Sequence, residues 1–238
     1  MFNFAQHTIV YITFAQKYAF FILAAMWQIV KFFLHEEWKG KYAVIGVLLY
    51  IFTAVLISYL TVQGMDKVQY ASVFWIIVIF TTLQGIAKGF MQMRKGSFVF
   101  WHQMCSPWQF LAARMLVSTL LMMVFTAFTF LLFVSMHGSV DMSYSGFLLT
   151  TFLTGMGISS VFTISSSIAA KTDNPGVLLP VLTFPVILPV LLVGVKAGKK
   201  AVDDLGVGTL AGDIGVLLLF NLLIVVLGII LMKFIWKE

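Results

Sequence analysis

The chain has 238 residues, of which 61% are hydrophobic and only 10% are charged. A soluble domain of this length is nearer half apolar and a quarter charged, so most of the apolar surface must face lipid. The net charge of +6 does not indicate nucleic-acid binding, because the basic residues are spread along the chain and stand mostly at the ends of apolar runs, as in membrane proteins. The single cysteine, Cys105, excludes an internal disulfide and a cysteine metal cluster.

The first 25 residues contain two apolar stretches separated by Gln16 and Lys17. A membrane span here would bury Lys17 near the bilayer centre, which is costly, and the start of the chain has no basic residue for a secretory signal. Two interpretations stay open for residues 1–25: a helix that lies on the membrane surface, or an extension upstream of a start at Met26. Residues 26–238 form one transmembrane domain in either case.

From Met26 the apolar residues recur at helical spacing. Val30 and Phe33 fall on one face, and Lys31 and His35 fall on the opposite face. This pattern predicts an amphipathic helix that lies in the membrane interface; the alternative is a solvated leader.

Six apolar runs are each long enough to cross about 30 Å of hydrocarbon. They are Tyr42–Val62, Tyr70–Lys88, Phe110–Met136, Gly146–Ala170, Gly176–Val195 and Ile214–Ile235. The sequence therefore predicts an all-α integral membrane protein with six transmembrane helices and an N-terminal interfacial helix. Most basic residues outside the runs lie on the side of the N-terminus, so the positive-inside rule places both termini in the cytoplasm. Three lysines in the predicted external loop Val195–Asp213 count against this orientation.

The segment Gly89–Trp108 is too polar to span a membrane and too apolar for an exposed loop. We expect an interfacial helix, a turn at Lys95-Gly96-Ser97, and a second short helix that ends at Ser106 and Pro107. Pro107 suits the start of the next helix.

The fifth apolar run contains Pro180, Pro185 and Pro189. Each proline removes a backbone hydrogen bond and kinks a helix. The fourth run is rich in serine, threonine and glycine, which allow close helix contact and can hydrogen-bond to the freed carbonyls. We expect these two helices to form a tight, mobile pair; the alternative is a purely structural kink.

The chain lacks the motifs of several enzyme classes. There is no P-loop, so the chain is not expected to hydrolyse ATP by itself. There is no H-E-x-x-H motif and no pair of acids within a predicted span, which argues against a membrane enzyme and against proton-coupled transport. His102 and His137 are able to ligate haem iron, although a histidine at a membrane boundary is more often an interfacial polar tip.

Three stretches carry a resemblance to a known family: Glu36–Tyr50, Lys88–Pro107 and, most specifically, the proline-interrupted stretch Gly176–Asp204. From about Met26 onward the chain resembles CcmB, haem exporter protein B of cytochrome c maturation, in its Bacteroidetes-like form. The second stretch departs from the family pattern at Gly89 and Met93.

The resemblance implies a permease of the type-2 ABC exporter class in the bacterial inner membrane. Such a permease works with the cytoplasmic ATPase CcmA and with the membrane proteins CcmC and CcmD, and the assembly delivers haem to the periplasmic chaperone CcmE. No cofactor is expected to be stably bound, and haem is a possible transported ligand. The resemblance leaves open whether the subunit moves haem or only couples ATP hydrolysis to release of the loaded chaperone.

Three sets of site residues follow. The expected ATPase-coupling residues are Glu36, Glu37, Trp38, Arg94, Lys95, Gly96, Ser106 and Pro107. The expected gating residues are Pro180, Pro185 and Pro189, and the possible haem contacts are His102 and His137. Two other functions stay open, namely an ABC permease for another substrate and a non-transporting scaffold of the maturation complex.

Overall fold

The computed structural model describes residues 26–62, 64–91, 105–138, 143–170, 172, 174–203 and 206–235. Within these residues, six helices are long and apolar enough to span a membrane. They are α2 (Lys41–Thr61), α3 (Lys67–Met91), α5 (Pro107–His137), α6 (Tyr144–Ala169), α7 (Pro175–Val202) and α8 (Gly206–Ile235). Residues 26–39 are also helical and precede α2. The predicted all-α membrane fold with six spans is therefore confirmed.

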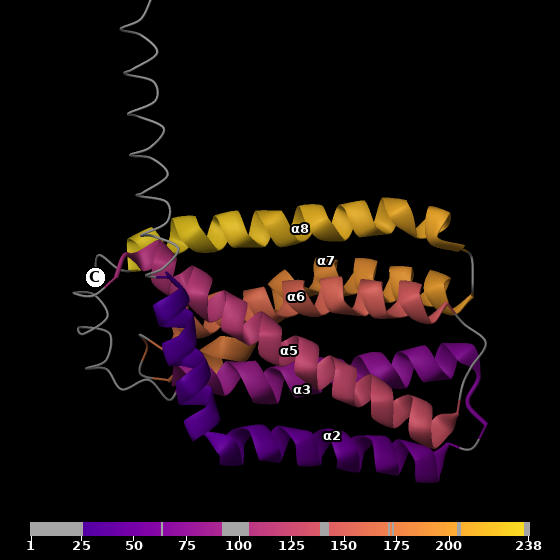
Figure 1. Cartoon of the computed structure of the whole chain (residues 1–238). Coiled ribbons are helices and arrows are strands. Elements are labelled where there is room, and N and C mark those ends of the chain that lie inside the picture. Colours follow the sequence, from indigo (N-terminus) through magenta and orange to yellow (C-terminus); the bar gives the residue numbers. More distant parts are fainter. Residues whose placement is uncertain are drawn as a thin grey trace, which may run out of the picture.

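The spanning helices lie alongside one another, and α5 crosses the bundle diagonally (Figure 1). The helix of residues 26–39 runs across the end of the bundle at which α2 begins (Figure 1). We call this end, where α2, α5 and α7 begin, the cap end, and the opposite end, where α3, α6 and α8 begin, the far end. Because the number of spans is even, residues 26 and 235 lie at the same end, the cap end.

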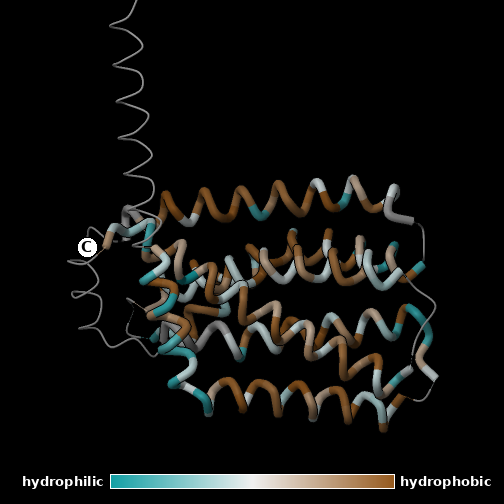
Figure 2. The backbone as a smooth tube through the Cα atoms, in the orientation of Figure 1, coloured by the Kyte–Doolittle hydropathy of each residue, from teal (hydrophilic) through white to brown (hydrophobic). Residues whose placement is uncertain are grey.

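Hydropathy follows the arrangement that a bilayer requires. The middle of the helices is strongly apolar, and hydrophilic residues gather at the two ends of the bundle (Figure 2). Large apolar side chains on α7 and α8 face outward, including Val181, Leu192 and Leu219. A segment in lipid must satisfy its backbone hydrogen bonds internally, so these apolar runs become helices.

Helix α6 lies at the centre of the bundle and contacts α3, α5, α7 and α8. Its buried face is made of small and hydroxyl-bearing residues such as Gly155, Gly157 and Thr154. Small residues allow neighbouring helices to approach closely, whereas large apolar residues are better placed toward lipid. Composition therefore explains why this helix is central.

The predicted loop Val195–Asp213 is wrong. Helix α7 continues to Val202 and α8 begins at Gly206, so most of this segment is helical. The charges that indicated a loop pair with one another instead: Lys200 and Lys196 of α7 both contact Asp213 of α8. Because these charges are paired, the helix can continue through a stretch at which hydropathy alone predicts that the span ends.

Several predictions lie outside the described residues. The turn at Lys95-Gly96-Ser97, the coupling residues Arg94, Lys95 and Gly96 and the haem contact His102 fall between residues 92 and 104. The N-terminal extension covers residues 1–25.

Candidate functional site

The helix of residues 26–39 is fixed to the bundle by one apolar face. Val30 and Phe33 are buried, whereas Trp27 and Phe32 are exposed. The ring of Phe33 packs edge to face against Phe110 near the start of α5, with a centroid distance of 5.4 Å. This placement confirms the predicted amphipathic helix, and it shows that the apolar face contacts α5.

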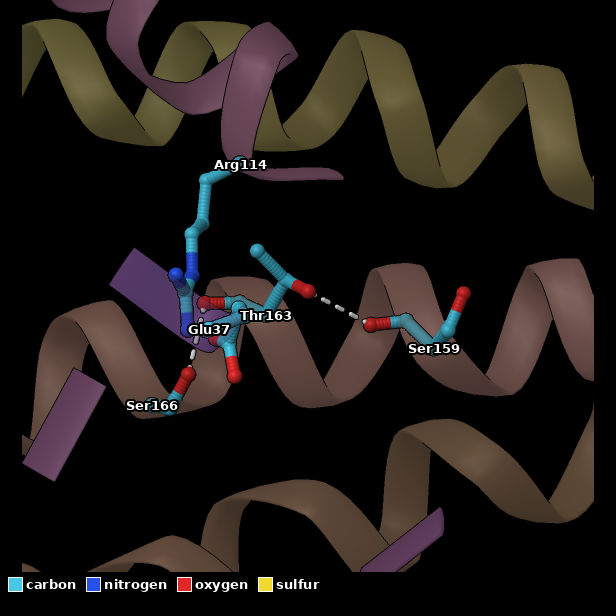
Figure 3. Close-up of polar contacts among 5 residues, drawn as sticks. All are labelled: Glu37, Arg114, Ser159, Thr163 and Ser166. Carbon is cyan, nitrogen blue, oxygen red and sulfur yellow. Dashed lines mark hydrogen bonds and ion pairs between the residues drawn. The ribbon is translucent and has the colours of Figure 1, made fainter. Parts of the chain in front are cut away.

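A partly buried ion pair joins the same helix to α5. Arg114 Nη2 donates to Glu37 Oε1 at 2.7 Å, and the two side chains are 4% and 21% exposed. The Arg114 guanidinium also lies 5.4 Å from the Phe33 ring centroid, which adds a cation–π contact. In the view of Figure 3, Arg114 extends from α5 toward Glu37 in front of the part of α6 that carries Thr163 and Ser166.

The Glu37–Arg114 pair was only half predicted. Glu37 was expected as a coupling residue, whereas the sequence indicated no partner for it. The structure shows instead that Arg114 is 3% exposed and faces Glu37. The pair therefore joins the N-terminal helix to α5, and removing one partner would leave the other charge uncompensated.

The other predicted coupling residues within the described part take different positions. Glu36 and Trp38 are exposed at the cap end, where a partner can reach them. The Ser106 backbone N–H donates to Gln109 Oε1 at 3.2 Å, and Pro107 is the first residue of α5. Ser106 and Pro107 therefore determine where α5 begins.

Helices α6 and α7 form the closely packed pair that the sequence predicted. Pro180 and Pro189 are half-buried, and Pro185 is exposed. Within the described residues, the serine and threonine hydroxyls of α6 do not make the expected bonds to α7. Hydroxyls of α6 donate back within their own helix, as Thr154 does to the Thr150 carbonyl at 2.7 Å and Thr163 does to Ser159 at 2.7 Å. Each hydroxyl bonds within its own helix because the carbonyl three or four residues earlier lies one turn away.

His137 is the last residue of α5, at the far end. Its Nε2 lies 3.3 Å from Ser58 Oγ of α2. Its ring stacks on Phe133 at a centroid distance of 4.8 Å and meets Tyr59 edge to face. The imidazole is thus packed among aromatic rings and a hydroxyl, and the described residues contain no group of three or more metal-ligating side chains.

In a comparison with protein families, residues 36–234 match the family described as CcmB protein. The chain belongs to the CcmB family. A search of curated proteins and a search of solved structures found no match to this chain.

The CcmB match begins at Glu36, within the helix that carries Glu37, and it includes Arg114 and all six spans except the last residue of α8. Membership makes the chain a multi-pass membrane permease subunit of cytochrome c maturation, with a role in haem export and with partners in the Ccm system, and not a catalytic enzyme. The cap-end contacts described above are therefore contacts of a CcmB-family permease.

Proposed function

We propose that this CcmB-family subunit couples ATP hydrolysis by CcmA to haem delivery through the cap end of its bundle. The observation that carries the proposal is the partly buried Glu37–Arg114 pair. It ties a helix with an exposed outer face to α5, which in turn contacts the central helix α6. A push on the exposed face of residues 26–39 would thus reach the middle of the bundle.

In this proposal CcmA binds the cap end at Glu36, Trp38 and the segment that contains Arg94, Lys95 and Gly96. The protein lies in the bacterial inner membrane, its cap end faces the cytoplasm, and both termini are cytoplasmic. CcmC and CcmD lie beside the bundle, and the haem-loaded CcmE chaperone is released on the far side. Reporter fusions to the C-terminus test the orientation: fluorescent-protein activity is expected and alkaline phosphatase activity is not.

The close packing of α6 and α7 favours coupling over conduction of haem through this bundle. A Cβ atom on Gly157 would lie 2.8 Å from Val190 Cγ1, so the two helices leave no space between them at this level. If the subunit couples ATP hydrolysis and does not conduct haem, haem is not bound within it. Purified protein alone is expected to show no haem absorbance, and haem that co-purifies with the isolated subunit would contradict it.

The pair can be tested by complementing a gene deletion with variants and staining membranes for covalently bound haem. Arg114→Ala and Glu37→Ala are each expected to abolish c-type cytochromes while CcmA still co-purifies. The exchange Glu37→Arg with Arg114→Glu is expected to restore part of the signal. Lys39→Ala, an exposed charge on the same helix, is the matched control. Immunoblots of the membranes separate loss of coupling from loss of protein.

A second arm replaces Arg94, Lys95 and Gly96 together, which is expected to release CcmA. Normal CcmA association together with normal cytochrome c would remove these residues from the proposal. Normal covalent haem in the Arg114→Ala strain would contradict the coupling role of the pair.

A further inference from the structure

A small cleft opens at the far end between α3 and α7. Lys67, Val68 and Ser72 line it from α3, and Val195, Lys199 and Asp203 line it from the end of α7. Its volume is about 50 Å³, which is too little for a macrocycle. The cleft lies at the level where α3 begins and α7 ends, and hence at the headgroup level of the bilayer.

The charged residues of the cleft do not take part in the ion pairs of the neighbouring lysines. Lys196 and Lys200 both contact Asp213, on the side of α7 that faces α8. Lys67, Lys199 and Asp203 form no ion pair with one another or with other described residues. Two lysines and one aspartate therefore line the same small cleft, a set of charges that complements a phosphate and an ammonium held a few bonds apart.

Apolar residues continue the cleft into the bilayer. One turn below Ser72, Ile76 of α3 is 54% exposed, and one turn below Val195, Leu192 of α7 is 68% exposed. Residues three or four positions apart lie on the same helix face. A ligand with its headgroup in the cleft would thus have its acyl chain beside exposed apolar side chains of α3 and α7.

We propose that this cleft binds a phospholipid with a phosphoethanolamine headgroup. Lys67 and Lys199 hold the phosphate, and Asp203 holds the primary ammonium group. Phosphatidylcholine carries the same phosphate and net charge, but its methylated nitrogen has no N–H to donate to Asp203. The inference does not depend on the proposed coupling function or on which side of the membrane the far end faces.

Native mass spectrometry of the full-length chain in detergent tests the proposal. Phosphatidylethanolamine, phosphatidylcholine and phosphatidylglycerol with identical acyl chains are titrated separately. The wild type is expected to bind phosphatidylethanolamine about two- to fivefold more tightly than phosphatidylcholine, the size of one partly exposed ion pair. Asp203→Asn is expected to remove this preference, and Lys67→Gln with Lys199→Gln is expected to weaken binding of every lipid.

Lys41→Gln, an exposed lysine at the cap end, is the matched control and should behave as the wild type. Size-exclusion profiles and melting temperatures show whether each variant is folded. Equal affinity of wild type and Asp203→Asn for all three lipids would overturn the proposal. Displacement of the lipid by inorganic phosphate alone would also overturn it, because the site would then recognise phosphate and not a lipid.

Discussion

Gly194 of α7 lies directly against Thr154 of α6, so that a Cβ atom on the glycine would overlap the threonine side chain. One turn away the relationship is reversed, because Val190 of α7 packs directly against Gly157 of α6. Each helix thus supplies one glycine and one branched side chain, and the two contacts interlock. Such small-residue contacts replace the hydrophobic effect as the source of helix association in lipid.

Substituting Gly194→Ala should therefore separate the two helices. Overpacking a close contact costs about 1–3 kcal/mol, and the added methyl group meets Cβ as well as the tip of Thr154, so rotation of the threonine cannot relieve it. We expect a lower melting temperature in detergent, measured by intrinsic tryptophan fluorescence. Thr154→Ser in the same chain should recover part of the loss.

Gly46→Ala is the matched control for this variant. Gly46 lies on the exposed face of α2, where an added Cβ atom would meet nothing within 4 Å, and alanine is the better helix former. Its melting temperature should equal or exceed that of the wild type. A Gly194→Ala protein as stable as Gly46→Ala would show that α6 and α7 are not held at this contact.

The buried pair makes a prediction for stability as well as for coupling. Arg114→Met should destabilise the protein by up to about 3–5 kcal/mol, the cost of leaving a buried charge unpaired, because Glu37 loses its partner in a partly buried position. Arg114→Met combined with Glu37→Gln should cost less than Arg114→Met alone. A thermodynamic cycle of the four proteins, followed by thermal unfolding, measures the coupling energy; additive losses would mean that the two side chains act independently.

The same pair shows how far sequence reasoning reaches. Six spans follow from apolar runs of sufficient length, because a bilayer allows few other structures. The contact between Glu37 and Arg114 joins residues 77 positions apart, and hydropathy contains no information about which charges meet. The loop expected before Asp213 was wrong for the same reason: lysines lower the hydropathy of a segment whether they face water or pair across two helices.

The lysines near Asp213 should differ in their effect on stability. Lys200 Nζ lies 2.5 Å from Asp213 Oδ2 and its side chain is 31% exposed, whereas Lys196 Nζ lies 3.7 Å from Oδ1 and its side chain is 66% exposed. We expect Lys200→Gln to lower the unfolding free energy by up to about 1 kcal/mol and Lys196→Gln to have little effect. Equal losses in thermal unfolding would indicate that Asp213 is shared evenly.

Cys105 should react slowly with maleimide near neutral pH. Burial raises the pKa of the Cys105 thiol, so at a given pH less of it is the reactive thiolate than in an exposed cysteine. The rate should climb with pH and reach its plateau at a higher pH than that of a reference thiol. Mass spectrometry of the timed reaction measures this, with Cys105→Ala and Lys39→Cys together as the exposed reference. Identical pH profiles for the two thiols would contradict the effect of burial.

His137 allows a direct test of the haem-contact hypothesis. Its ring stacks on Phe133 and its Nε2 faces Ser58, contacts that explain the residue without a ligand. His137→Phe keeps the stack and loses only the hydrogen bond, which is worth about 1 kcal/mol. We therefore expect a small drop in melting temperature and normal covalent haem in membranes. His137→Ala removes both contacts and should be less stable than His137→Phe. If His137→Phe abolishes covalent haem at wild-type protein levels, the imidazole nitrogen itself is needed, and His137 becomes a haem contact at the far end.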